Sequence, residues 1–339
     1  MLKLRQATVI STDPLTVDLA GEQRPAWADT GLVGACEVGD LVVVNTEARD
    51  LGLGSGGFDI VHVNLTRGLD GEGAESEHVM KLNYSSLQHP VATIERPVGD
   101  RGPGSAVPVL AIGLHGHLAP AAWAARAASD GGQALRIAYV QTGGGALPGS
   151  MSDDVKCLLD SGLIAGHITA GPAYGGQSEA ISLVGALDAA GSLGFDGVMA
   201  GPGPGILGSA TTYGHGGMAA LDAAHAGLSL GAAVAVSARL SSSDPRPRHR
   251  GLSHHTRTVL ELLLEAVVVP VPEGRDDLAE ALMQISGGMH RVRFEPVDLD
   301  GYCRSGLPRN TMGRDIDDDP DFFSGSLAAG AALFNLIGN

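Results

Sequence analysis

From Ala106 onward the chain alternates short apolar segments with amphipathic ones, and no other feature constrains the fold as strongly. Repeated strand-then-helix units predict an α/β fold with a doubly wound, mostly parallel sheet, because parallel strands must be joined by crossover connections. Strand-like runs of apolar and β-branched residues are found at 107–113, 135–141, 164–170, 197–200, 232–240 and 266–271. Helical spacing of apolar residues is found at 120–128, 152–161, 178–190, 218–228, 256–265 and 276–285.

The first 105 residues follow a different pattern, which predicts a small all-β domain, either a barrel or a sandwich. Strand-like runs are separated by Gly, Asp and Pro, and they occupy 7–10, 16–19, 40–45, 59–64 and 79–84. Residues 96–105 are rich in Pro and Gly and are expected to form a linker. We therefore predict two domains, 1–105 and 106–339. The second is a Rossmann-like α/β domain that ends in an acidic segment, 315–321, and a helix of small residues, 322–337.

One glycine pattern in the first domain matches a dinucleotide-binding fingerprint by spacing alone. Gly52, Gly54 and Gly57 satisfy G-x-G-x-x-G, but that fingerprint must open a helix. Here another strand-like run, 58–65, follows. We therefore interpret the segment as a glycine-rich hairpin or a substrate-facing loop.

Composition excludes several classes of function. A formal net charge of -16 and a pI of about 5.0 argue against nucleic-acid binding, which needs a broad basic surface. No run of about 20 apolar residues is present to cross a membrane, and the N-terminus lacks the apolar core of a signal peptide. Three cysteines, far apart in the chain, form neither a zinc motif nor a disulfide framework. We expect a cytoplasmic protein that binds neither nucleic acid nor membrane.

Glycines and histidines gather in the loops that follow the predicted strands. In a parallel sheet, ligands bind outside the carboxyl ends of the strands, so these loops mark the expected pocket. The loops contain His115 and His117, then Gly143, Gly144 and Gly145, and further along the chain residues 171–176 and 201–215. Consecutive glycines at 143–145 allow a close backbone approach to a ligand.

A basic stretch, residues 246–258, stands out in this acidic chain. It lies between a predicted strand and a predicted helix, with Ser253 at the position of the helix N-cap. Arg248, Arg250 and Arg257 can donate to phosphate or carboxylate, and the helix start already favours negative charge. We therefore predict that these four residues bind a small anionic ligand.

Histidines on neighbouring loops suggest the chemistry at this pocket. His215, His254 and His255 are candidates for a general acid or base near neutral pH. A metal site is the alternative, because His115 and His117 have a spacing that metal hydrolases use. The carboxylate that usually follows that motif is absent, and the chain has no H-E-x-x-H helix, so polar histidines without metal are favoured and no cofactor is assigned.

Several segments together resemble a bacterial family known as domain of unknown function 3866. They are V-N-T-E-A-R-D-L-G-L-G-S-G-G, T-G-G-G-A-L-P, S-D-P-R-P-R-H-R-G-L-S-H-H-T and T-M-G-R, spread over nearly the whole chain. The resemblance implies no activity, cofactor or catalytic residue.

Two classes of function therefore remain open from the sequence. The first is an enzyme, a hydrolase or group transferase, that acts on a small anionic or phosphorylated substrate at the carboxyl edge of the sheet, with a metal-dependent hydrolase as its variant. The second is a non-catalytic ligand-binding or assembly protein, in which the basic stretch pairs with the acidic segment 315–321 within the chain or across a homo-oligomer.

Overall fold

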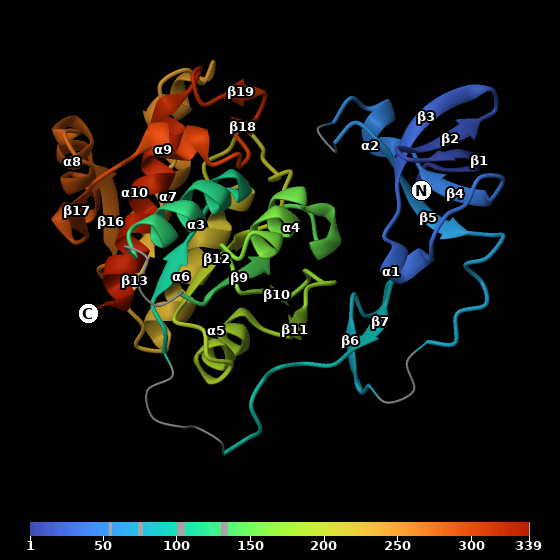
Figure 1. Ribbon diagram of the computed structural model, residues 1–339, viewed down its shortest axis with the longest axis horizontal. Helices are drawn as coiled ribbons and strands as arrows, with labels where there is room; N and C mark the ends of the chain where they lie inside the picture. Colours follow the sequence, from blue (N-terminus) through green and yellow to red (C-terminus); the bar gives the residue numbers. More distant parts are fainter. Residues whose placement is uncertain (54–55, 74–76, 100–105, 130–134, 339) are drawn as a thin grey trace. The chain divides into compact units, whose positions relative to one another are not determined.

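The computed structural model describes residues 1–53, 56–73, 77–99, 106–129 and 135–338 (Figure 1). The chain folds into two compact units, Met1–Ala92 and Thr93–Asn339. Residues 100–105 of the expected linker lie outside the described residues. At the start of that segment, Arg96 donates to Asp188 through Nε and Nη2 at 2.9 and 2.7 Å, so the residue packs on the second unit.

The first unit contains a closed five-stranded barrel. The sequence predicts either a barrel or a sandwich, and the structure shows the barrel. Its strands are β1 (Leu4–Thr12), β2 (Leu15–Leu19), β3 (Glu22–Trp27), β4 (Leu41–Asn45) and β5 (Asp59–Asn64), in the order β1-β2-β3-β5-β4. Pairing of β4 with β1 closes the barrel. Small β-branched side chains fill it, because alternate residues such as Val42 and Val44 point inward and are fully buried.

The glycine-rich segment before β5 is followed by a strand, as the sequence predicts. Gly52 and Gly57 have φ of +65° and +81°, and Gly54 lies outside the described residues. The segment connects two carboxylates, Asp50 and Asp59, whose oxygens each lie 2.6 Å from the guanidinium of the buried Arg24. Arg24, Asp50 and Asp59 therefore form one ion cluster at the two ends of this segment.

The second unit is built on one eight-stranded sheet in which every pairing is parallel. The order is β11-β10-β9-β12-β8-β13-β16-β17. The strands are β8 (Val109–Ala111), β9 (Ile137–Thr142), β10 (Gly166–Ala170), β11 (Ser178–Ala180), β12 (Gly197–Pro202), β13 (Val234–Val236), β16 (Val268–Pro272) and β17 (Arg291–Glu295). The predicted fold class, a small barrel followed by an α/β unit, is confirmed.

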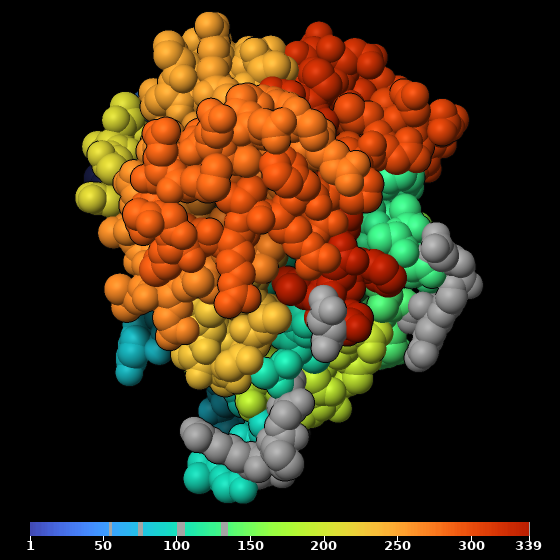
Figure 2. Space-filling model, turned by 90° about the vertical axis from the view of Figure 1, so that its left-hand side faces the viewer, coloured from blue at the N-terminus to red at the C-terminus, as the bar shows by residue number. Residues whose placement is uncertain are grey.

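Helices cover both faces of the sheet (Figure 1). One core lies under α5 (Leu183–Ser192), α6 (Ala219–Ser229), α7 (His254–Leu262) and α8 (Asp276–Met283). The other lies under α3 (Leu118–Ala127), α4 (Asp153–Asp160), α9 (Leu299–Arg304) and α10 (Pro320–Ile337). Figure 2 shows the surface over α8 and β17 in orange, with part of the red C-terminal helix beside it.

The predicted helix at 178–190 is wrong in its first turn. Residues 178–180 form the edge strand β11, and Ser182 then caps α5 by accepting a hydrogen bond from the N–H of Gly185 at 2.9 Å. Glu179 also forms a parallel bridge with Thr93, so pairing with distant residues selects the strand. Three short two-stranded pairs were not predicted: β6 with β7 (Val79–Lys81 and His89–Val91), β14 with β15 (Leu240–Ser241 and Gly251–Leu252), and β18 with β19 (Asn310–Thr311 and Arg314–Asp315).

The strand order creates a switch point beside the central strand β8. The chain leaves β8 to form β9 on one side of it, and later places β13 on the other side. Helix α3 follows β8 and packs in one core, whereas α7 follows β13 and packs in the other. The loops after β8 and β13 therefore diverge to opposite faces and leave a crevice at the carboxyl edge, where α/β proteins bind ligands.

Among the described residues, no helix is both long and apolar enough to span a bilayer. Helix α10 is instead buried within the second unit against α3 and the sheet. Its approach to α3 depends on Gly330, because a Cβ atom there would meet the backbone carbonyl of Ala121. Gly338, at the end of the same helix, has φ of -80° and its Cβ position is 3.9 Å from the closest atom.

We predict that Gly330→Ala destabilises the second unit by about 1–3 kcal/mol, because the methyl group forces the two helices apart. Gly338→Ala, which adds the same methyl group in open space, should leave the free energy of unfolding within about 0.5 kcal/mol of the wild type. Urea denaturation monitored by circular dichroism measures both values. Equal stabilities for the two variants would contradict this account of the helix packing.

Candidate functional site at the carboxyl edge

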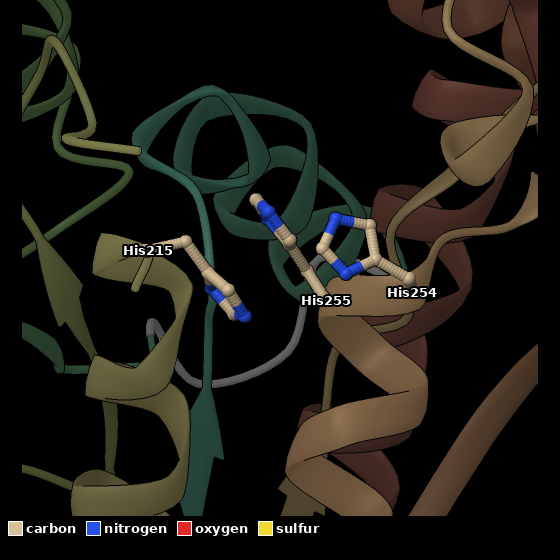
Figure 3. Close-up of side chains that lie close together, drawn as sticks. All are labelled: His215, His254 and His255. Atoms are coloured by element: carbon tan, nitrogen blue, oxygen red, sulfur yellow. The ribbon is translucent and has the colours of Figure 1, made fainter. Parts of the chain in front are cut away.

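Four histidines converge beside the switch point. His215 lies in the loop between β12 and α6, His254 and His255 are the first two residues of α7, and His249 lies in the loop before α7. The rings of His215 and His255 stack with centroids 3.7 Å apart, and His254 lies 4.4 Å from His255. Figure 3 shows three of them reaching into the space between the start of α7 and the loop before α6. The structure thus brings together the three histidines predicted as acid–base candidates.

Ser253 fixes the start of α7 and one of the rings. Its Oγ accepts a hydrogen bond from the backbone N–H of His255 at 3.2 Å, as expected for the predicted N-cap. The same Oγ lies 2.7 Å from Nδ1 of His249. Since Ser253 is fully buried, this single hydroxyl ties the helix start to the loop before it.

Several ring nitrogens of the cluster have no hydrogen-bond partner among the described residues. Both ring nitrogens of His215 and Nε2 of His254 are buried without one. Buried polar atoms are nearly always paired, because leaving them unpaired costs the free energy of removing them from water. These unpaired nitrogens are therefore candidate ligand-binding atoms.

The histidines of the cluster are neutral at physiological pH. Burial, followed by the charges of neighbouring groups, lowers the pKa of His249 to about 3 and of His255 to about 2. Burial also lowers the pKa of His254 and of His215, although the nearby backbone of Thr212 acts in the opposite direction on His215. A neutral imidazole keeps one nitrogen lone pair free to accept a proton or bind a metal.

A buried arginine that the sequence analysis missed completes the site. Arg239 follows β13 and is only 3% exposed. Its Nη2 donates to Oδ2 of the fully buried Asp244 at 3.1 Å, and its Nη1 lies 3.3 Å from Nδ1 of His255. Burial lowers the pKa of Arg239 to about 10, so the guanidinium is still charged at neutral pH. A charged residue at the end of an otherwise apolar strand was the available signal.

Asp244 holds the basic stretch in place. Arg246 donates to both of its carboxylate oxygens at 2.9 Å, and Nε of Arg250 donates to its backbone carbonyl at 2.9 Å. Burial opposes ionisation of Asp244, yet hydrogen bonds and charge from Arg246, together with the charge of Arg239, lower its pKa overall. The carboxylate is thus ionised and shared between cations.

The arginines predicted to bind an anion lie at the rim of the site. Arg248, Arg250 and Arg257 are exposed, whereas the inward-facing cation is Arg239. The sequence pattern could not distinguish these orientations.

The acidic segment 315–321 pairs with other arginines of the same chain among the described residues. Arg309 contacts Asp315 and Asp317, Nε of Arg314 lies 3.0 Å from Asp319, and Arg275 contacts Asp321. The ion pairs of this segment therefore involve none of the three rim arginines.

His115 and His117 are buried and point in different directions. Nε2 of His115 lies 2.7 Å from Oγ of Ser152, which is the N-cap residue of α4. Nδ1 of His117 lies 3.0 Å from Oγ of Ser237, after β13. Burial lowers the pKa of His115 to about 4 and of His117 to about 3. Neither belongs to the trio of His215, His254 and His255 whose donor atoms converge.

The loop that contains Gly143, Gly144 and Gly145 packs closely against the loop that follows β12. A Cβ atom at Gly144, where φ is +104°, would meet the backbone of Gly216, and one at Gly145 would meet the backbone of Gly203. Gly143 and Gly144 also line a cleft of about 410 Å³, together with His215 and Asp222. The predicted glycine loop therefore shares this cleft with His215.

A small cavity lies in the crevice between β8 and β13. Its volume is about 10 Å³, which is close to the minimum for one water molecule. The walls include His117, Arg239, His255 and Gly217.

We predict that Ser253→Ala costs more stability than removal of an ordinary helix cap. The cap itself contributes about 1 kcal/mol, and leaving Nδ1 of His249 buried and unpaired adds about 1–3 kcal/mol. Ser182→Ala removes only the exposed cap of α5 and should cost about 1 kcal/mol. Urea titrations of both variants give the comparison, and equal losses would mean that the hydroxyl acts only as a cap.

Comparison with known proteins gives a family but no activity. No curated protein and no solved structure matches this chain. Residues 26–330, which include strands β4 and β5 of the barrel and the entire candidate site, match one family. On that match, the chain belongs to the family described as Protein of unknown function (DUF3866).

Proposed function

We propose that the second unit is an enzyme that binds a small anionic substrate, such as a phosphorylated molecule, and catalyses hydrolysis or group transfer at the site beside the switch point. The observation that carries the proposal is the convergence of His215, His254 and His255 next to the buried Arg239. Imidazoles and a guanidinium in one partly buried space are groups that enzymes use for such reactions.

Local charge supports an anionic substrate. Ion pairs join three arginines to two buried aspartates, and three further arginines lie exposed on the adjoining loop and helix. The arginines are Arg239, Arg246, Arg314, Arg248, Arg250 and Arg257, and the aspartates are Asp244 and Asp319. An excess of four positive charges in a chain of net charge -16 favours an anion at this place.

The start of α7 adds to this attraction. The positive end of its dipole lies at residues 253–255, which also supply His254 and His255. The cleft lined by Gly143, Gly144 and His215 gives a small molecule access to the same ring. The cleft thus reaches His215, whose ring stacks on that of His255 at the start of α7.

We expect pyrophosphate to raise the thermal unfolding temperature of the full chain, because a ligand that binds only the folded state stabilises it. At 100 times its Kd the anion contributes about 2.7 kcal/mol, or roughly 5–10 °C for a unit of this size. Arg250→Ala should remove the shift, and the loss of the hydrogen bond from its Nε to the Asp244 carbonyl should cost the free protein no more than about 1 kcal/mol. Arg291→Ala, which changes an exposed arginine on β17, is the matched control and should keep the shift.

Absence of a shift with phosphate, pyrophosphate and a panel of nucleotides and sugar phosphates would overturn the anionic substrate. So would a shift that Arg250→Ala leaves unchanged. Incubation with the anions that bind, followed by detection of released phosphate, then tests the reaction. Tight binding without turnover would support the alternative of a non-catalytic ligand-binding protein.

A further inference from the structure

We propose that His215, His254 and His255 bind a divalent transition-metal ion, and that Zn²⁺ is the ion their donor set fits best. One nitrogen from each of the three side chains lies within 4.8 Å of the other two. They come from two segments far apart in the sequence, the loop before α6 and the start of α7 (Figure 3). The binding of metal stands on this geometry alone, and only its use in catalysis rests on the proposed function.

Two of the three histidines have ring nitrogens without a hydrogen-bond partner among the described residues. His215 is 6% exposed, and neither of its ring nitrogens has a hydrogen-bond partner among the described residues. Nε2 of His254 is likewise buried and unpartnered in the part of the chain that the structure describes. No described acidic group occupies these nitrogens, so a metal ion would replace no ion pair.

The contact with Arg239 determines which ring nitrogen of His255 carries the proton. Nη1 of Arg239 lies 3.3 Å from Nδ1 of His255, and a guanidinium can only donate. Nδ1 of the neutral ring therefore presents its lone pair, and the proton is on Nε2. A metal ion at Nδ1 would replace a long, weak hydrogen bond and release Arg239 for an anion.

Gly217 provides room for the ion. A Cβ atom at this residue would lie 3.0 Å from Nδ1 of His215 and 3.3 Å from Nδ1 of His255. The two Nδ1 atoms thus flank the position that any other residue would fill with a side chain. The small cavity lined by Gly217, His255 and Arg239 adjoins it. Absence of a side chain here leaves space between two potential ligands.

Metal binding requires a modest rearrangement of the rings. His215 and His255 are stacked at 3.7 Å with an angle of 7° between their planes, whereas metal ligands direct their lone pairs at one point. Rotation about χ2, which is a soft torsion for histidine, tilts the rings toward a common centre. The required Zn–N distance is about 2.0–2.1 Å.

Three imidazoles are a donor set typical of catalytic zinc. Such sites use three protein ligands and leave the fourth position to water or substrate, and imidazole favours Zn²⁺ over the oxygen-seeking Mg²⁺ and Ca²⁺. Bound Zn²⁺ would lower the pKa of its water to about 7. In hydrolysis the oxygen of that water joins the electrophilic atom of the substrate, the bond to the leaving group breaks, and the leaving group takes up a proton.

The surrounding charges favour an anion as the fourth ligand. Asp244 is fully buried and offsets the charge of Arg239, and the remaining arginines attract an anion toward the ion. Anion and metal should therefore bind cooperatively, since each reduces the repulsion that the other would meet alone.

The test is calorimetric titration of the full chain with Zn²⁺ after dialysis against a chelator, with the Co²⁺ absorption spectrum as a second readout. We expect one Zn²⁺ per chain and a visible Co²⁺ spectrum without thiolate bands. His215→Ala and His255→Ala should each weaken Zn²⁺ binding by more than about 100-fold, because changes outside the ligand set already cost 10- to 100-fold. Gly217→Ala should weaken it while keeping all three ligands.

Matched controls separate ligation from damage to the fold. His225→Gln replaces a half-buried histidine on α6 that lies outside the trio, and it should bind Zn²⁺ like the wild type. Gly113→Ala adds a methyl group to the opposite wall of the cavity, 3.6 Å from the carbonyl oxygen of Gly217, and should also bind normally. Circular dichroism spectra check that each variant is folded.

Absence of Zn²⁺ binding by the wild type would overturn the metal site, as would unchanged affinity in folded His215→Ala. If a histidine variant does not fold, Gly217→Ala against Gly113→Ala decides the question. Equal Zn²⁺ affinities for those two glycine variants would also overturn it. Stabilisation by pyrophosphate in chelator-treated protein distinguishes the two proposals, because anion binding can persist when metal binding fails.

Discussion

The architecture of this protein depends on one constraint, the parallel direction of all eight strands in the larger sheet. Parallel neighbours cannot be joined by tight turns, so a helix must return the chain after most strands. Every strand therefore ends at the same edge, and the loops that follow meet there. Because β8 is flanked by β12 and β13, segments more than 100 residues apart in the sequence, such as His115 to His117 and the start of α7, become neighbours at this edge.

Within that edge, the buried pair of Arg239 and Asp244 organises the basic stretch. A buried ion pair is costly unless further hydrogen bonds accompany it, and here Arg246 donates to the Asp244 carboxylate through its backbone N–H and its side chain. The pair fixes the loop that leads into α7 and so determines where His254 and His255 lie. By contrast, Arg248, Arg250 and Arg257 are exposed to solvent and make no ion pair among the described residues, so an anion can reach their guanidinium groups.

Backbone packing between loops brings His215 to the same place. Gly144 and Gly216 approach so closely that neither position accommodates a side chain, and Gly217 leaves space beside two imidazole nitrogens. The abundance of glycine at this edge therefore has two consequences. It allows the loops to interlock, and it leaves room for a metal ion between histidines that belong to different elements.

The sequence by itself determined the class of fold, the N-cap at Ser253, the strand-to-helix position of the basic stretch and three of the four clustered histidines. These follow from local periodicity and from residue types next to strand ends, which act over a few residues. Only the tertiary structure decided the strand order, the edge strand at 178–180, the inward position of Arg239 and the separation of His115 from the cluster. Each of these depends on which distant segments pack together, and packing sets burial, which decides whether an arginine faces solvent or a buried carboxylate.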